Sequence, residues 1–339
     1  MAEVMARPGN PSSPHRAGRL AHELLERSRR AVAMRLGTDP DRIVFTAGGT
    51  EANNLAMTGL PGPRLVGATE HASVLEVDRD AVSVPVDRDG LIDLASLERL
   101  LAEHRPTLVA LMLGNNETGV IQPVREAARL AHAAGCLLHC DAVQAFGKLP
   151  FTLGELGADT LSLSAHKLGG PPGVGALVLG PQVEPAALLR GGGQEGRRRA
   201  GTPNLPGIVG LATAVEAAGD WSEIARLQET LEQGILALRP DAIVLGDGAG
   251  RLPTITCLAT PGCSGEVMLM ALDLAGIAVG IGAACSSGRI GPSHVLAAMG
   301  LPRATAGNAI RISLGWNSSA ADVAAFLAAW SARAAAEPA

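Results

Sequence analysis

The chain of 339 residues contains no tyrosine, and aromatic residues make up only 2% of it. It also lacks a basic excess, since its formal net charge is −5, so nucleic acid is not an expected partner. No apolar run approaches the roughly 20 residues that cross a bilayer, and the first residues do not form the apolar core of a signal peptide. These absences indicate a cytoplasmic protein that binds neither a membrane nor nucleic acid directly.

Cysteine is scarce, with five residues and no CxxC pair. This pattern argues against a disulfide framework or a zinc site, so no intrinsic metal is expected. Cys136 and Cys140 fall in one apolar run, where strand geometry places both on the same face and predicts core packing. Hydrophobic residues make up 47% of the chain, which allows a large core, and the length allows two domains.

Short apolar runs alternate with helical segments through the first part of the chain. The predicted strands are residues 42–46, 64–68, 81–86, 107–113, 136–141, 160–164 and 175–179. Helical segments such as 17–36, 93–104 and 124–134 lie before or between them. Continuous apolar strands separated by helices predict an α/β fold, with a mostly parallel seven-stranded sheet covered by helices.

A glycine- and arginine-rich loop, residues 191–201, precedes a change of pattern, and its Arg tract 197–199 is expected to be a solvated turn. A long helical stretch over 206–238 then leads into a second region. Its predicted strands are 242–245, 254–259, 278–281 and 310–314, and its helices are 266–275 and 320–335. We therefore predict a large domain over residues 10–222, and a smaller C-terminal α+β domain over 223–339 that includes residues 1–9.

Lys167 ends an apolar run and is followed at once by glycines and prolines. Its amine is therefore expected at a sheet edge, beside backbone that a ligand approaches closely. Asp141 ends its own apolar run further upstream. A lysine that forms a Schiff base and a carboxylate that keeps a ring nitrogen protonated are the groups that pyridoxal 5'-phosphate chemistry needs. This pair makes an enzyme the leading hypothesis.

Residues 45–55 form a predicted strand, a glycine turn and the start of a helix, with Thr50 as the expected N-cap. The free N–H groups and dipole of such a helix suit a phosphate, although an ordinary capped helix is the alternative. Ser164 and His166 are further candidate phosphate donors, and a structural hydrogen bond is the alternative for His166.

Two further polar groups follow predicted strands. Asn116 is a candidate donor to the phenolate oxygen of the cofactor, with Gln144 within reach of the same atom, or else it belongs to an asparagine turn. His71 could stack on the ring and carry protons near neutral pH, or be an ordinary surface histidine. Ligands of parallel sheets lie at the carboxyl ends of strands, where all these candidates fall.

Two residues of the second region carry chemistry. Cys285 lies in a loop of small residues without bulky neighbours, which suits a nucleophilic thiol better than a core cysteine. Arg311 lies on a predicted apolar strand and needs a partner there. A substrate carboxylate held by its bidentate fork is one candidate, and a structural salt bridge is the other.

Together these runs resemble the cysteine desulfurases, which are pyridoxal-phosphate enzymes of the class V aminotransferase group with fold type I. The matching runs are 9–13, 45–54, 69–71, 115–123, 141–150, 162–179, 191–202, 283–288 and 310–314. They follow the family's order over nearly the whole chain, and the ordered set is specific although each run alone is weak.

The resemblance implies a role for each matching residue. Lys167 would be the Schiff-base lysine and Asp141 the partner of the ring nitrogen. The residues implied to bind phosphate are Gly49, Thr50, Ser164 and His166, together with Thr202, which would reach the phosphate of the neighbouring subunit in a homodimer. The remaining implied contacts are Asn116 and Gln144 with the phenolate oxygen, His71 with the ring, and Arg311 and Asn10 with the substrate carboxylate.

The implied reaction converts L-cysteine to L-alanine. Lys167 would move the protons, and Cys285, as thiolate, would attack the substrate sulfur and become a persulfide. The sulfur would then pass to an acceptor protein, such as an iron–sulfur scaffold or a component of tRNA thiolation. Cys285 could also transiently ligate an iron–sulfur cluster.

Two departures from the family pattern stand out. Family members usually begin with a strand that carries a Leu-Asp-x-x-Ala-Thr segment, which this chain lacks, and substrate binding is expected to suffer most from that loss. Trp316 stands where the family more often has a basic residue. The alternatives are a selenocysteine lyase, an aminotransferase of the same fold, or an N-terminally truncated non-catalytic partner. Cys285 discriminates against an aminotransferase, and the intact Lys167, Asp141 and His71 argue against a non-catalytic chain.

Overall fold

The computed structural model describes residues 1–6, 9–282 and 293–334. They divide into two compact units, which are described separately. The first unit comprises Met1–Val84, Leu94–Leu113 and Pro123–Gly219, and the second comprises Pro85–Asp93, Gly114–Gln122 and Asp220–Ala339.

Apart from the boundary itself, which lies after Gly219 instead of residue 222, this grouping differs from the expected domain bounds at three short segments. Helix α1 (Ala2–Met5) packs on α8 (Leu205–Ala217) of the first unit. The segment 114–122 instead joins the second unit, because the Ile121 N–H donates to the Gly250 carbonyl at 2.8 Å. Residues 85–93 join the same unit. Such pairings across long stretches of chain leave no trace in local sequence pattern.

The first unit is built on a seven-stranded sheet in the order β1-β7-β6-β5-β4-β2-β3. The strands are β1 (Ile43–Thr46), β2 (Arg64–Gly67), β3 (Val82–Val84), β4 (Leu108–Ala110), β5 (Leu137–Asp141), β6 (Thr160–Ser164) and β7 (Gly175–Leu179). Only β7 runs antiparallel to its neighbours, β1 and β6, so the predicted mostly parallel sheet is confirmed. The carboxyl ends of the other strands therefore share one edge.

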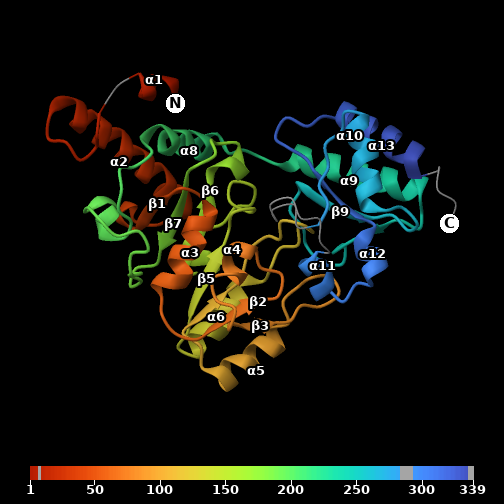
Figure 1. Ribbon diagram of the computed structural model, residues 1–339, viewed down its shortest axis with the longest axis horizontal. Coiled ribbons are helices and arrows are strands. Elements are labelled where there is room, and N and C mark those ends of the chain that lie inside the picture. The colour runs from red at the N-terminus through yellow and green to blue at the C-terminus, as the bar shows by residue number, and fades with distance from the viewer. Residues whose placement is uncertain (7–8, 283–292, 335–339) are drawn as a thin grey trace. The chain divides into compact units, whose positions relative to one another are not determined.

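Helices cover this sheet because each presents an apolar stripe to it. In α5 (Leu94–His104) the buried residues Leu97, Leu100 and Leu101 follow helical spacing. Helix α3 (Gly49–Gly59) packs on β5, β6 and β7 (Figure 1). The other helices of the unit are α2 (Arg16–Leu36), α4 (Ala72–Leu75), α6 (Val124–Ala133) and α7 (Leu153–Leu156). Among the described residues, no helix has both the length and the apolar character to span a membrane.

Strand β1 lies at one edge of the sheet, and a side chain covers part of that edge. The Phe45 N–H donates to Glu195 Oε2 at 2.8 Å, and both carboxylate oxygens of Glu195 accept from the Arg29 guanidinium at 2.8–2.9 Å. The loop that carries Glu195 is held further by an ion pair of 2.8 Å between Arg199 and Glu51. The expectation of a solvated Arg tract is therefore wrong for Arg199 and also for Arg198, which pairs with Glu184 at 2.8 Å, although it holds for the exposed Arg197.

The second unit contains a three-stranded antiparallel sheet in the order β10-β9-β8. Its strands are β8 (Ile243–Val244), β9 (Ile255–Ala259) and β10 (Ala309–Ser313). The strand expected over 278–281 is wrong: there, Gly280 forms an isolated bridge with Arg311. Gly276 and Gly282 flank this segment with φ of +79° and +42°, so the chain turns away on both sides of the bridge.

The helical stretch expected over 206–238 is two helices, α8 and α9 (Ser222–Leu238). Gly219 and Asp220 interrupt it, and Asp220 accepts hydrogen bonds from the backbone and hydroxyl of Ser222 at 2.9 and 2.8 Å. The other helices described in this unit are α10 (Gly265–Leu274), α11 (His294–Ala298), α12 (Arg303–Gly307) and α13 (Ala320–Ala334).

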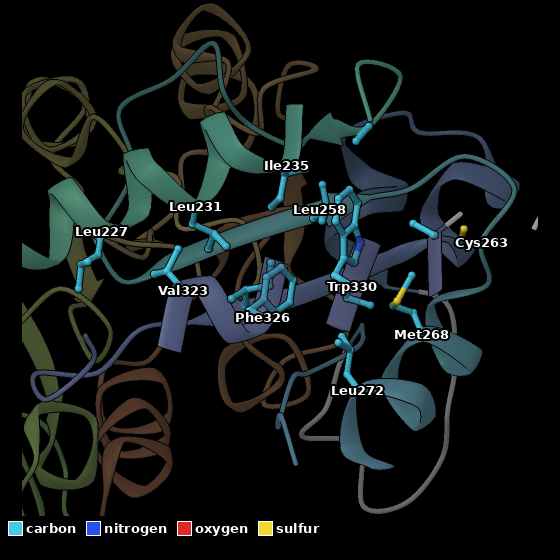
Figure 2. Packing of buried hydrophobic residues seen from close by; sticks show 14 of the residues in the cluster. Leu227, Leu231, Ile235, Leu258, Cys263, Met268, Leu272, Val323, Phe326 and Trp330 are labelled. Atoms are coloured by element: carbon cyan, nitrogen blue, oxygen red, sulfur yellow. The ribbon is translucent and has the colours of Figure 1, made fainter. Parts of the chain in front are cut away.

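Helices α9, α10 and α13 pack with β9 and β10 around one hydrophobic core (Figure 2). Trp330 of α13 lies within it and is 0% exposed, beside Leu258 and Phe326. Trp316, by contrast, is 75% exposed. The two tryptophans therefore offer a matched pair for testing the core.

Trp330→Ala is expected to lower the free energy of unfolding of the second unit by about 3–5 kcal/mol, because it leaves a large cavity in a packed core. Trp316→Ala, which removes the same group from the surface, should change it by about 0.5 kcal/mol or less. Denaturant unfolding followed by circular dichroism measures both. Equal losses in the two variants would contradict the packing described here.

Candidate active site

A buried carboxylate at the end of β5 is the centre of the candidate site. Asp141 is 6% exposed; its Oδ2 accepts from Asn53 Nδ2 at 2.7 Å and its Oδ1 from the Val143 N–H at 2.9 Å. Burial raises the pKa of Asp141, while the two donors and the charges of His71 and Lys167 oppose the shift. The protonated ring nitrogen of pyridoxal phosphate would supply a further positive charge that stabilises such a buried carboxylate.

His71 begins helix α4 as its N-cap. Its Nδ1 accepts from the Ser73 N–H at 3.1 Å and lies 2.8 Å from Ser73 Oγ. Because a backbone N–H is always a donor, Nδ1 must be the acceptor, and neutral His71 then carries its proton on Nε2. The ring is half-buried and is electrostatically coupled to Asp141, so it is not an ordinary surface histidine.

Lys167 lies in the short helical turn Ala165–Leu168 that follows β6. It is half-buried, and its charge lowers the pKa of Asp141. Ser164, the last residue of β6, is buried with its Oγ 3.0 Å from His166 Nδ1, and His166 is exposed. Although much of its surface is exposed, partial burial of the imidazole, followed by the charge of Lys167, lowers the pKa of His166. The Lys167 amine, the Ser164 hydroxyl and the His166 imidazole therefore lie at the same end of the sheet.

The start of α3 approaches the same place. A Cβ on Gly49 would lie 2.6 Å from Val143 Cγ2 and 3.5 Å from Ser164 Cβ, so only glycine allows the start of α3 to pack this closely on Val143. The first turn of the helix therefore lies near Ser164, and the N–H groups of a first helical turn suit a phosphate. The expectation that Thr50 caps the helix is wrong, because Gly48 is the N-cap and Thr50 lies exposed in the first turn.

Lys148 contacts Gln144 and is a residue that sequence reasoning missed. Its Nζ donates to the Gln144 carbonyl at 2.8 Å and to Gln144 Oε1 at 3.3 Å. Since Oε1 is engaged, the Gln144 side-chain N–H groups remain for an oxygen of a ligand. Burial, together with the charge of Lys167, lowers the pKa of Lys148 to about 8.

Asn10 and Thr202 lie on exposed loops of the first unit. Asn10 Oδ1 accepts from the Ser12 N–H at 2.9 Å, so this oxygen is used in a local turn. Thr202 lines a small pocket together with Thr46 and Ala47 at the end of β1. The roles expected for both residues stay predictions.

Arg311 and Asn116 belong to the second unit. The Arg311 Nη1 donates to the Asn116 carbonyl at 3.0 Å, and a Cβ on Gly280 would lie 3.0 Å from Arg311 Nη2. Arg311 Nε is buried and has no hydrogen-bond partner among the described residues. The guanidinium therefore keeps a donor for a further acceptor, as a carboxylate would be.

The asparagine turn expected as one alternative is present at Asn115. Its Oδ1 accepts from the N–H groups of Glu117 and Thr118 at 2.8 and 2.9 Å. Asn116 follows it and is half-buried. The turn therefore forms, and it leaves the Asn116 side chain as a candidate ligand contact.

Cys285 lies outside the described residues. The four cysteines within the described part, Cys136, Cys140, Cys257 and Cys263, are free and buried. This confirms that Cys136 and Cys140 pack in the core. Burial raises the pKa of Cys136 and Cys257 to about 12, so these thiols stay protonated and are poor nucleophiles.

Sequence reasoning also missed Glu70 and Asn53. Glu70 is 0% exposed, its Oε1 accepts from the Met112 N–H at 2.6 Å, and burial together with the charge of Asp141 raises its pKa to about 8. Asn53 is 1% exposed and faces the sheet with Gly49, Ala52 and Ala56. An amide on the apolar stripe of a helix is the signal that could have identified it.

The sequence matches the family model described as aminotransferase class-V over residues 2–326, and the chain belongs to this family. Its mostly parallel seven-stranded sheet is that of fold type I, as the resemblance implied. A solved structure of a NifS-like protein from Rickettsia africae has a TM-score of 0.90 and 33% identity, and the match covers 97% of this chain and 92% of that one.

Similar proteins of known name are cysteine desulfurases. The chain is 47% identical to a cysteine desulfurase of Cereibacter sphaeroides, over 93% of this chain and 86% of that protein. It is 40% identical to an IscS-like cysteine desulfurase of Mycobacterium tuberculosis, over 96% of this chain and 90% of that protein. The resemblance inferred from the ordered sequence runs is therefore confirmed at the level of the family.

In Glu70→Gln, the free energy of unfolding is expected to fall less between about pH 4.5 and 8 than it does in the unaltered protein. The pKa of Glu70 rises from 4.5 to about 8 on folding, so the folded chain keeps a proton that the unfolded chain releases. Its stabilising contribution is complete below pH 4.5 and is lost as the pH rises through 8. Melting temperatures across this range measure it, with the exposed Glu76→Gln as charge control. Parallel profiles for Glu70→Gln and the unaltered protein would refute the assignment.

Proposed function

We propose that the protein is a pyridoxal-phosphate-dependent cysteine desulfurase that converts L-cysteine to L-alanine. The observation that carries the proposal is the buried Asp141, held by two N–H donors and coupled electrostatically to Lys167 and His71 at one edge of the sheet. Relatives that bear the name cysteine desulfurase match more than nine-tenths of the chain, which supports the same reaction.

The residues at this edge fit the cofactor. Bound pyridoxal phosphate supplies an electron sink for the bond changes at the substrate α-carbon. Asp141 would keep the ring nitrogen protonated, and Gln144, with Asn116, would donate to the phenolate oxygen. The phosphate ligands would be the N–H groups of Gly49 and Thr50 with the side chains of Ser164 and His166, while Thr202 would serve the neighbouring subunit of a homodimer.

Proton transfer falls to two residues of the first unit. Lys167, once free of the cofactor, would take the α-proton of the substrate and return a proton to the cofactor side. His71 carries a proton on Nε2 in its neutral form and would donate from that atom. Arg311 and Asn10 would hold the substrate carboxylate, and the Nε donor of Arg311, which has no partner in the described part of the chain, supports its role.

Cys285 would be the sulfur acceptor within the chain. A free thiol has a pKa of about 8.5, so Cys285 must lose its proton before it attacks. The S–S bond forms as the substrate C–S bond breaks, and the carbon takes the electron pair and later a proton. L-cysteine and one thiol thus become L-alanine and one persulfide.

The persulfide sulfur would pass to an acceptor protein, such as an iron–sulfur scaffold or a component of tRNA thiolation. We place this activity in a cytoplasmic homodimer whose subunits divide near residue 222 into a cofactor-binding domain and a smaller domain that carries Cys285. Neither a membrane nor direct nucleic-acid binding is part of the proposal.

Addition of L-cysteine to the cofactor-loaded protein, with dithiothreitol as final sulfur acceptor, is expected to yield alanine and sulfide in equal amounts. Cys285→Ala should lose both products but keep the visible absorption of the bound cofactor. Lys167→Ala should lose the absorption of the lysine-bound form as well.

The alternatives give other results in the same experiment. With a 2-oxo acid added, transfer of the amino group without release of sulfide would make the protein an aminotransferase. With selenocysteine offered in place of cysteine, turnover of selenocysteine alone would make it a selenocysteine lyase. A loaded cofactor without any turnover would indicate a non-catalytic chain.

Arg311→Ala is expected to raise the KM for L-cysteine about 10- to 100-fold, since a charge-assisted hydrogen bond contributes about 1.5–3 kcal/mol. The absorption of the bound cofactor should stay as in the unaltered protein. Steady-state kinetics with Arg251→Ala as control measures it, because Arg251 pairs with Glu232 elsewhere in the same unit. An unchanged KM would remove Arg311 from the substrate site.

A further inference from the structure

Asp141 and His71 are the two ends of one buried chain of hydrogen bonds in the first unit. Asn53 stands at its centre: one N–H of its amide group donates to Asp141 Oδ2 at 2.7 Å and the other to Ser73 Oγ at 2.8 Å. Ser73 Oγ lies 2.8 Å from His71 Nδ1. Asn53 and Ser73 are 1% and 8% exposed, so the links between the two ends are shielded from water.

The Asn53 amide has a further partner on its other side. His139 Nε2 lies 3.0 Å from Asn53 Oδ1, and His139 Nδ1 lies 2.8 Å from Thr160 Oγ1. His139 is 0% exposed, and burial lowers its pKa to about 3, so it is neutral and has one N–H. A flipped Asn53 amide would put its oxygen against the Asp141 carboxylate. The Asp141 carboxylate therefore requires the orientation in which the amide N–H groups face it, and His139 fits that orientation with its proton on Nε2.

The direction of each remaining bond follows from this orientation. Ser73 Oγ accepts from Asn53, so the hydroxyl proton of Ser73 is the one left to donate to His71 Nδ1. Both oxygens of Asp141 accept hydrogen bonds from N–H groups, and these bonds favour its charged form. The chain thus specifies a carboxylate at one end and an Nε2-protonated imidazole at the other.

We propose that Asn53 is a positioning residue that couples the protonation states of Asp141 and His71 through Ser73, with His139 as the hydrogen-bond partner of its amide oxygen. The proposal deepens the proposed function, since it concerns the two groups that would flank the cofactor ring. If His71 takes a proton on Nδ1, the Ser73 hydroxyl can no longer donate to it and must turn its proton away. The hydroxyl proton would then point toward the Asn53 N–H, which is itself a donor.

The coupling acts among several other titratable groups. Those that face Asp141 are Glu70, His71, Lys167 and, on its own strand, His139 and Cys140. The charges of Glu70 and Lys167 interact with Asp141, and Asn53 donates a hydrogen bond to it directly. A change at Asn53 therefore alters the hydrogen-bonded link without removing any of these charges.

The decisive variant is Asn53→Asp, which keeps the size of the side chain but replaces two N–H donors by an acceptor. Ser73 would then donate to the new carboxylate and cease to donate to His71. Asn54→Asp is the matched control: it makes the same change one residue along α3, where Asn54 Nδ2 donates to the carbonyls of Thr50 and Ser73 at 2.9 and 3.1 Å. Ser73→Ala cuts the chain without adding charge.

Nitrogen-15 NMR of histidine-labelled protein without cofactor reads the coupling directly. The unaltered protein and Asn54→Asp should both show neutral His71 with an unprotonated Nδ1. Asn53→Asp and Ser73→Ala should both move the Nδ1 signal toward that of a nitrogen with fewer hydrogen-bond donors, because Nδ1 loses the hydroxyl donor and keeps only the backbone N–H of residue 73. A His71 signal that stays unchanged in these two variants would overturn the proposal, and Ser73→Ala decides alone where Asn53→Asp does not fold.

The visible absorption of the cofactor-loaded protein gives a second reading. Asn53→Asp should move the pH at which this absorption titrates by about one unit or more, because the ring-facing carboxylate loses a donor and gains a negative neighbour. Asn54→Asp should leave that pH unchanged, and equal shifts in both variants would count against the coupling. Failure of the unaltered protein to bind cofactor would refute the proposed function, whereas the NMR result would still decide the coupling.

Discussion

The burial of one carboxylate determines much of the first unit. Asp141 ends a strand that is covered on both faces, so its charged form depends on the N–H donors and on the positive charge of Lys167 near it. That requirement explains why an amide occupies the apolar face of α3 at Asn53, and why a neutral histidine, His139, lies beneath the amide. The polar network forms at the strand ends because the sheet brings together residues that are far apart in sequence.

The fold and the charged end of the site could be predicted from sequence, because their signals are local. The bounds of β6 and β7 agree with the expectation to the residue, and Lys167 and Asp141 were identified as the ends of apolar runs. The link from Asp141 to His71 could not, because Asn53 and Ser73 meet only when α3 packs on both β5 and α4. The strand expected over 278–281 failed for a related reason: its apolar alternation is real, yet glycines at either end limit it to one bridge.

The two units show different ways of keeping a polar group in an apolar setting. In the first unit, the ionisable groups near Asp141 are satisfied by protein donors or kept neutral, as His139 is. In the second, Arg311 keeps a buried Nε without a partner among the described residues. A donor left in this state favours any acceptor that reaches it, since the cost of its desolvation has already been met within the fold.

Glu195 has a consequence for how copies of this chain can associate. An uncovered edge strand is a template on which another strand can add, and many proteins join or aggregate in this way. At β1 the Phe45 N–H is already taken by a carboxylate that a buried guanidinium holds in place. Continuous extension of the sheet across that edge is therefore blocked, and contacts between copies on this side must be made by side chains rather than by backbone.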